Sequence, residues 1–156
     1  MNVNLTETNK RTIPIDQYLD HMEQPCKQTF LTRKQTYQLN TDAVNQLRQF
    51  AHDYVVIAFS ASWCKDCSQS IPVLALLAEA TGIEVRVFGG LIKDPLNPSC
   101  KWRIPPSPPE AVTFNVDMLP LIIVFDIHGT EVGRVVESAK RCSTLEQELC
   151  MIIGSM

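Results

Sequence analysis

The sequence has no surplus of basic residues, no long apolar run and no apolar leader. Lys and Arg total 14 against 17 Asp and Glu, so there is no basic field to attract nucleic acid or anionic lipid. No apolar run reaches the roughly 18 residues that a membrane helix needs. Residues 1–11 are polar, unlike the core of a secretory signal. We therefore expect a cytoplasmic protein without a nucleic-acid or membrane partner.

The composition is typical of one globular domain. The chain has 156 residues, of which 45% are apolar and 20% charged, and it contains no internal repeat. Its six cysteines are many for a cytosolic protein and few for a disulfide scaffold of this length. Two of them, Cys64 and Cys67, are close neighbours, and the other four are Cys26, Cys100, Cys142 and Cys150.

Residues 1–39 are interpreted as an extension in front of the main domain, which we place at residues 40–156. The first 11 residues are polar and are expected to form a flexible tail. The pattern of residues 14–24 predicts a short amphipathic helix with Thr12 as its cap. Residues 26–40 carry no clear pattern.

The apolar pattern of the main domain predicts an α/β fold, a mixed sheet with helices on both faces. The continuous apolar run YVVIAF at 54–59 is typical of a strand buried on both sides, and the helix and strand after it imply a parallel pair. The predicted elements are a helix from Asn40 or Thr41, strands at 54–59 and 83–88, a helix at 67–81 ended by Gly82, a proline-rich insertion at 91–118 with a short helix near 109–115, hairpin strands at 121–127 and 131–137, and a last helix capped by Ser143 with Glu146.

The strongest chemical signal is Trp63-Cys64-Lys65-Asp66-Cys67, which follows the buried strand and opens a helix. Two cysteines three apart in a first helical turn share one face, with Cα atoms roughly 5–6 Å apart, which a disulfide tolerates. Cys64 at the helix N-terminus, next to the positive Lys65, is expected to be the more acidic thiol and the nucleophile. Cys67, one turn inside the helix, is expected to resolve the mixed disulfide.

Two other interpretations of the cysteine pair remain open. Both thiols could be inert, buried core residues. They could also form half of a zinc site, which needs two more ligands, and the sequence offers no second C-x-x-C or H-x-x-x-H pair. We therefore expect no metal and no cofactor.

Three separated marks within residues 40–153 resemble the thioredoxin family. The segment AFSASWCKDC is similar to the family's active-site strand and motif, and Pro72 matches the proline that kinks its active-site helix. Leu119-Pro120 looks like the cis-proline segment that faces the two cysteines. The helix sequence IPVLALLAEATG most resembles a poorly characterised bacterial and archaeal branch.

The resemblance implies a thioredoxin fold and thiol–disulfide exchange through Cys64 and Cys67. Trp63, Lys65 and Asp66 would support the site, and Leu119 with Pro120 would shape the substrate groove. The expected partners are disulfide-containing proteins and a thioredoxin reductase or another thiol reductant.

The sequence departs from the family pattern between and before the cysteines. Lys65-Asp66 stands where thioredoxin has Gly-Pro, and Ala58 stands where it has a buried aspartate. Proton transfer to and from Cys67 therefore needs another route, for which Asp66 and water are the candidates. These changes leave the substrate and the redox potential open.

The remaining candidates carry weaker signals. Cys26 and Cys100 could pair, whereas Cys142 and Cys150 are too far apart along the last helix, and Cys150 is interpreted as a small core residue. Trp102 is expected to pack under the proline-rich loop, with a substrate-facing role as the alternative. His128 is interpreted as a turn residue, and Asp126 and Glu131 as solvated strand ends.

We predict a thiol–disulfide oxidoreductase that acts mainly as a reductant. One alternative is a binding or adaptor module that uses the groove beside Pro120, and another is a disulfide oxidase or isomerase. The segment from Asp94 to Pro109 follows a strand parallel to 54–59, so it should leave from the edge of the sheet that carries Cys64. It is expected to border the active site and govern substrate choice, or else only to cover core.

Overall fold

A computed structural model of the chain, describing residues 1–96, 101–102 and 105–154, has a central five-stranded sheet in the order β1-β3-β2-β4-β5. β2 runs parallel to β3, with Val56 opposite Val85, and antiparallel to β4, while β5 is antiparallel to β4. The mixed sheet confirms the predicted fold class, and β1, antiparallel to β3, is an addition that the pattern did not reveal. The strands are β1 (Ile13–Pro14), β2 (Tyr54–Phe59), β3 (Glu84–Phe88), β4 (Leu121–Asp126) and β5 (Glu131–Val136).

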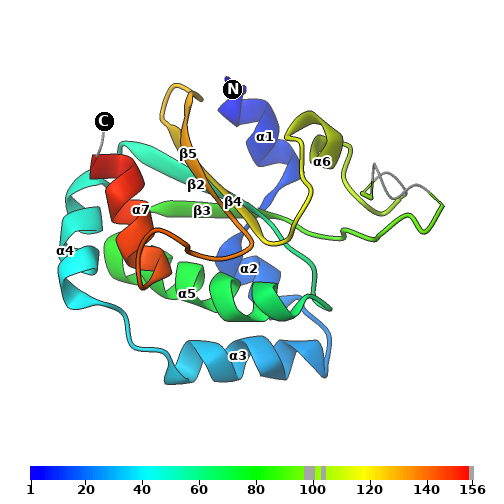
Figure 1. The fold of residues 1–156 in the computed structure, drawn as a ribbon, viewed down its shortest axis with the longest axis horizontal. Coiled ribbons are helices and arrows are strands. Elements are labelled where there is room, and N and C mark those ends of the chain that lie inside the picture. Colours follow the sequence, from blue (N-terminus) through cyan, green and yellow to red (C-terminus); the bar gives the residue numbers. More distant parts are fainter. Residues whose placement is uncertain (97–100, 103–104, 155–156) are drawn as a thin grey trace.

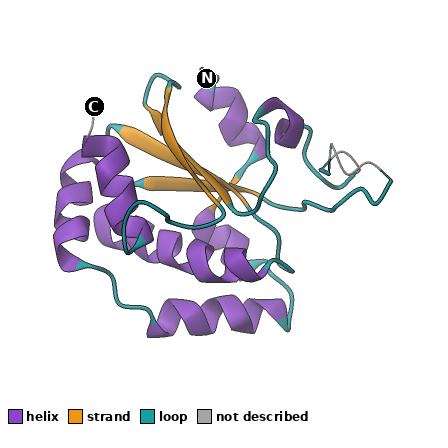
Figure 2. Cartoon of the chain, in the orientation of Figure 1, coloured by secondary structure: helices purple, strands orange, loops and turns teal. Residues whose placement is uncertain are grey.

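Helices cover both faces of this sheet (Figures 1 and 2). One layer holds five helices that pack against one another, with α5 in contact with α2, α3, α4 and α7. This layer comprises α2 (Ile15–Asp20), α3 (Cys26–Thr36), α4 (Thr41–Phe50), α5 (Lys65–Thr81) and α7 (Leu145–Gly154). The opposite side carries the two short helices α1 (Leu5–Arg11) and α6 (Glu110–Thr113) (Figure 1). Among the described residues, none of the helices is long and apolar enough to cross a membrane.

The core lies on both faces of β2 and β4, which are almost entirely buried. On the α6 side, Phe59 stacks on Phe88 with ring centroids 4.7 Å apart. Phe114, just after α6, packs against both rings and edge-on against Phe125. The end of the proline-rich insertion thus closes the core beneath α6.

The N-terminal residues correct the prediction of a flexible tail. Asn4 caps α1 through a hydrogen bond from the Glu7 N–H, and the preceding residues lie along the β4–β5 turn. The Val3 N–H donates to the Gly129 carbonyl at 2.8 Å. Gly129 has a φ of +87°, and a Cβ there would lie 2.0 Å from the Val3 oxygen. The contact joins residues more than 120 positions apart, so no local pattern could reveal it.

The other local expectations are confirmed at most positions and corrected at two helix starts. Asn40 caps α4, and Gly82, with a φ of +80°, ends α5 as predicted. Thr12 does not cap α2, because its hydroxyl donates to the Thr8 carbonyl and accepts from Arg86, and α2 begins after Pro14 and ends at Asp20. The unassigned stretch 26–40 contains α3.

The predicted capping box at α7 is displaced by one residue. Thr144 and Gln147 form it, each side chain accepting the other's backbone N–H. Glu146 is instead fully buried and accepts hydrogen bonds from the Tyr37 hydroxyl and the Asn40 N–H. Ser143–Glu146 and Thr144–Gln147 both fit the capping pattern, and only the distant donors to Glu146 select between them.

Candidate active site

The two neighbouring cysteines lie at the start of α5, beyond the carboxyl end of the central strand β2. Cys64 is the residue before α5, and its Sγ accepts the backbone N–H of Cys67 at 3.2 Å. This sulfur therefore takes the place of the usual side-chain oxygen that satisfies a free N–H in the first helical turn. Pro72 lies further along α5.

The two thiols differ in exposure and acidity. Cys64 is 9% exposed and Cys67 is 0% exposed, and both are free. The pKa of Cys64 is lowered to about 7, first by the hydrogen bond from the Cys67 thiol and then by backbone N–H groups of Cys67 and Asp66, which outweigh burial and the Asp66 charge. The pKa of Cys67 is raised, chiefly by burial and then by its hydrogen bond to Cys64.

This asymmetry has a different origin from the one expected of Lys65. Lys65 is exposed and is not among the causes of the lowered Cys64 pKa, and the neighbouring Asp66 charge raises it. The sulfur and backbone donors of the first turn produce the acidic thiol. Both intervening side chains point to solvent at the rim of the motif.

The Leu119–Pro120 segment lies next to Cys64. Its peptide bond is cis, and the Cys64 Sγ donates to the Leu119 carbonyl at 3.8 Å. Leu119 and Pro120 are buried, whereas the preceding Met118 is 39% exposed. A backbone carbonyl thus lies beside the more accessible sulfur.

Trp63 connects the motif to the proline-rich insertion. Its indole is 52% exposed, and its Nε1–H donates to the Leu91 carbonyl at 3.1 Å. Its ring lies 6.1 Å from that of Trp102, which is buried and donates to the Asp117 carbonyl. Trp102 therefore packs beneath the insertion, and the described part of the insertion borders the motif. Residues 97–100 and 103–104 of the predicted 94–109 segment lie outside the described residues.

A cavity of about 450 Å³ opens next to Trp63, between the motif loop and the N-terminal segment. From the motif loop it is lined by Ala61, Ser62 and Trp63. Tyr18 of α2 and the residues after α2, including His21 and Glu23, form the opposite wall. The extension before residue 40 thus takes part in the surroundings of the motif.

A family model described as thioredoxin matches residues 12–90, a little more than half of the chain. The chain belongs to the thioredoxin family. The match includes the motif and begins at residue 12, ahead of the span 40–153 on which the resemblance was placed. The division of the chain at residue 39 stays a prediction.

Solved structures share the fold of this thioredoxin-family chain. A protein of unknown function from Pseudomonas aeruginosa is 14% identical, with a TM-score of 0.67 over 98% of this chain and 89% of that chain. An HIV epitope-scaffold is also 14% identical, with a TM-score of 0.72 over 99% of both chains. At this identity the likeness shows the fold alone. No curated protein sequence matches the chain.

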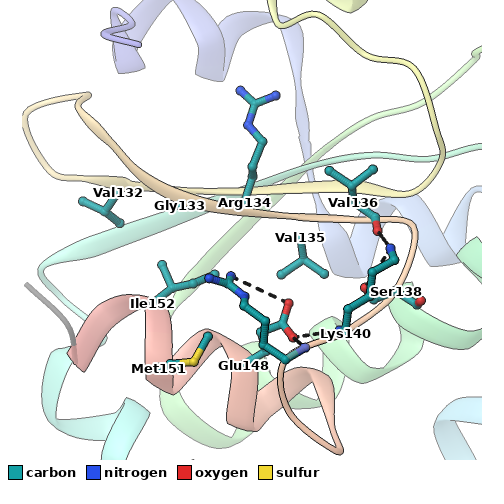
Figure 3. A pocket seen from close by; sticks show the side chains of 11 residues that line it. Val132, Gly133, Arg134, Val135, Val136, Ser138, Lys140, Glu148, Met151 and Ile152 are labelled. Carbon is teal, nitrogen blue, oxygen red and sulfur yellow. Dashed lines mark hydrogen bonds and ion pairs between the residues drawn. The ribbon is translucent and has the colours of Figure 1, made fainter.

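A second cavity of this chain, about 660 Å³, lies between β5 and α7, and no residue of the motif lines it (Figure 3). Glu148 lies on its α7 side, facing Val135 of β5 (Figure 3). Its carboxylate accepts the backbone N–H groups of Lys140, Arg141 and Cys142 and pairs with the Arg141 guanidinium at 3.9 Å. These donors tie the 140–142 loop to α7, so Glu148 is interpreted as a structural carboxylate.

The other cysteines lie apart from the motif or outside the described residues. Cys150 is half-buried, its thiol donates to the Ala43 carbonyl, and burial raises its pKa to about 11. Cys26 begins α3 and Cys142 lies before α7, while Cys100 lies outside the described residues, so its pairing with Cys26 stays a prediction. In the part of the chain that the structure describes, no three His, Cys, Asp or Glu side chains converge to hold a metal ion.

At the β4–β5 turn one expectation holds and another is corrected. His128 is an exposed turn residue, and Asp126 accepts the N–H groups of His128 and Thr130. Glu131 is not a free solvated end, because it forms a two-point ion pair with Arg134 that lowers its pKa.

Proposed function

We propose that this protein is a thiol–disulfide oxidoreductase that reduces protein disulfides through Cys64 and Cys67. The observation that carries the proposal is the contrast between two thiols one helical turn apart. Cys64, with its pKa lowered to about 7, is about half ionised at neutral pH and able to attack. Cys67 is buried and neutral, so it is held back until a mixed disulfide has formed.

The reaction transfers two electrons from the dithiol to the substrate. The Cys64 thiolate attacks one sulfur of the substrate disulfide, forms a mixed disulfide and releases the other sulfur as a thiolate. Cys67 then loses its proton and attacks the Cys64 sulfur, so that the mixed disulfide breaks and the second substrate thiolate leaves. An external thiol reductant, such as a thioredoxin reductase, restores the dithiol, as expected in a cytoplasmic setting.

The substrate groove would run between the motif and the Leu119–Pro120 segment. The Leu119 carbonyl lies next to the Cys64 sulfur and can accept an N–H from an extended peptide. Met118, which precedes Leu119, and Trp63, which precedes Cys64, supply exposed apolar surface. Lys65 and Asp66 add one charge of each sign at the rim, where they would contact the flanks of a protein substrate.

Insulin reduction with dithiothreitol as electron donor tests this function. The wild-type protein should turn over, Cys64→Ser should not, and Cys67→Ser should accumulate a mixed disulfide with substrate. Absence of turnover by the wild-type protein, together with absence of trapping by Cys67→Ser, would contradict the proposal and favour an adaptor role for the groove. The midpoint potential of the Cys64–Cys67 couple separates the reductant from an oxidase or isomerase.

A further inference from the structure

The resolving step of the proposed function requires a proton to leave a thiol that has no contact with solvent. Cys67 is 0% exposed, and burial is the largest cause of its raised pKa. Asp66 is exposed and is not among the main causes of the Cys67 pKa shift, and Ala58, buried on β2, has no ionisable group. Neither Asp66 nor Ala58 therefore accounts for ionisation of this thiol.

Two hydroxyl groups, those of Ser60 and Tyr18, lie on the side of Cys67 that faces α2. Ser60, the residue after β2, is fully buried, and its hydroxyl acts with the backbone N–H of Ala61 to lower the pKa of Cys67, against the larger raising effect of burial. The Tyr18 hydroxyl of α2 donates to the Ser60 Oγ at 3.1 Å. The Ser60 N–H donates to the Phe88 carbonyl, which fixes the serine against β3. Two hydroxyls thus lead in series from α2 to the buried thiol.

The Tyr18 ring is closely fitted into this position. Gly89 follows β3, and a Cβ there would lie 2.9 Å from the ring atom Cε1 of Tyr18. Tyr18 is half-buried and is one of the residues that line the cavity of about 450 Å³ beside the motif. Burial, the largest cause, raises its pKa to about 12, so the phenol stays protonated and available as a donor.

We propose that Ser60 and Tyr18 form a donor relay that stabilises the Cys67 thiolate during resolution and connects it to the cavity. In this step the Cys67 proton passes through the hydroxyls to water in the cavity, while the donors turn toward the sulfur. The new thiolate forms the bond to the Cys64 sulfur, and the electron pair of the mixed disulfide leaves with the substrate sulfur. In this relay Ser60 acts on the reacting sulfur directly, whereas Tyr18 acts through Ser60 and is a positioning residue.

Stopped-flow reaction with an aromatic disulfide such as 5,5′-dithiobis(2-nitrobenzoate) separates the two chemical steps. The first release of coloured thiolate reports attack by Cys64, and the second reports resolution by Cys67. The Cys67→Ser variant lacks the second step and gives the background from the other cysteines. A wild-type protein without the first phase would overturn the proposed function, whereas the relay is tested by the second phase alone.

Ser60→Ala should slow the second phase about tenfold or more, and Tyr18→Phe about three- to tenfold, because each removes a hydrogen bond to a charged group or its donor. The first phase should keep its rate. The pH midpoint of the second phase should move upward by up to about one unit, the equivalent of that tenfold change. The other titratable groups that bear on Tyr18 are Cys26 and Cys64, with His21 and Glu23 lining the same cavity.

Two further variants make the test specific. Tyr37→Phe removes a tyrosine hydroxyl that binds Glu146, away from the motif, and should leave both phases unchanged. Gly89→Ala should displace the Tyr18 ring and slow the second phase in the same direction as Tyr18→Phe. If Ser60→Ala does not fold, Tyr18→Phe, which keeps the ring, still decides. An unchanged second phase and pH midpoint in a folded Tyr18→Phe protein would overturn the relay.

Discussion

The motif and the start of α7 both bury ionisable side chains, but they treat them in opposite ways. At α7 the buried carboxylates of Glu146 and Glu148 are surrounded by donors, which reach Glu146 from Tyr37 and Asn40. At the motif the buried Cys67 has few donors, so its neutral form is favoured and its pKa is raised. Burial among many donors stabilises a carboxylate in its charged form and joins the segments that supply the donors. Burial with few donors keeps a thiol neutral.

Two half-buried tyrosines, Tyr18 and Tyr37, show the same contrast. Burial raises the pKa of both Tyr18 and Tyr37 to about 12. The hydrogen bond to Glu146 raises the pKa of Tyr37 further, because the carboxylate holds the phenolic proton. The hydrogen bond to Ser60 acts in the opposite direction on Tyr18. One hydroxyl therefore anchors a carboxylate, whereas the other contacts the serine of the proposed relay.

The sharpest test of the comparison is Cys64→Ser. Removal of the acidic thiol should reduce insulin turnover by on the order of 1000-fold, because the nucleophile itself is lost, with little change in the free energy of unfolding. The matched control is Cys150→Ser, which removes a thiol of raised pKa and should keep turnover near the wild-type rate. Equal losses in both variants would break the distinction between the two cysteines.

Glu146→Ala should lower the stability of the fold and leave the reactivity of Cys64 unchanged. It leaves the Tyr37 hydroxyl and the Asn40 N–H without their acceptor, which should lower the free energy of unfolding by about 3 kcal/mol. Urea denaturation measures the change, and the alkylation rate of Cys64 in the folded protein should stay the same. A marked change in that rate would mean that the two regions are coupled.

Alkylation followed over pH should separate Cys64 from Cys150. The pKa of Cys64 is lowered to about 7, so its thiolate is lost, and its alkylation slows, as the pH falls through 7. The pKa of Cys150 is raised to about 11, so its alkylation should keep rising with pH well beyond neutrality. At neutral pH Cys64 should be labelled roughly tens of times faster. Peptide mapping identifies the labelled residue, and preferential labelling of Cys67 would reverse the proposed roles.

The smallest expected effect is that of Trp63→Ala on substrate binding. The exposed indole links the motif to the insertion through Leu91 and Trp102, so its loss should raise the KM for a protein disulfide about three- to tenfold. The rate with a small aromatic disulfide should change less than twofold, since that substrate does not span the groove. Equal losses on both substrates would place Trp63 in the chemistry instead of in recognition.

The elements nearest the motif could be predicted from sequence because their signals are local. The strand 54–59, the turn into α5 and its end at Gly82 follow from an apolar run, a change of period and a residue that accepts positive φ. The C-x-x-C spacing within a first turn likewise placed Cys64 ahead of Cys67 along the helix. These features depend on residues within a few positions of one another.

Only the tertiary structure decided which distant groups meet. It brings Tyr18 to Ser60 across 42 positions, Tyr37 to Glu146 across 109, and Val3 to Gly129 at the sheet edge. A hydroxyl or a carboxylate can hydrogen-bond to many different groups. No local sequence pattern shows which distant group will be its partner. The sequence by itself determined the fold around the two neighbouring cysteines, whereas the packing of α2 and α7 determined which partners surround each buried ionisable group, because burial and donors are properties of the assembled core.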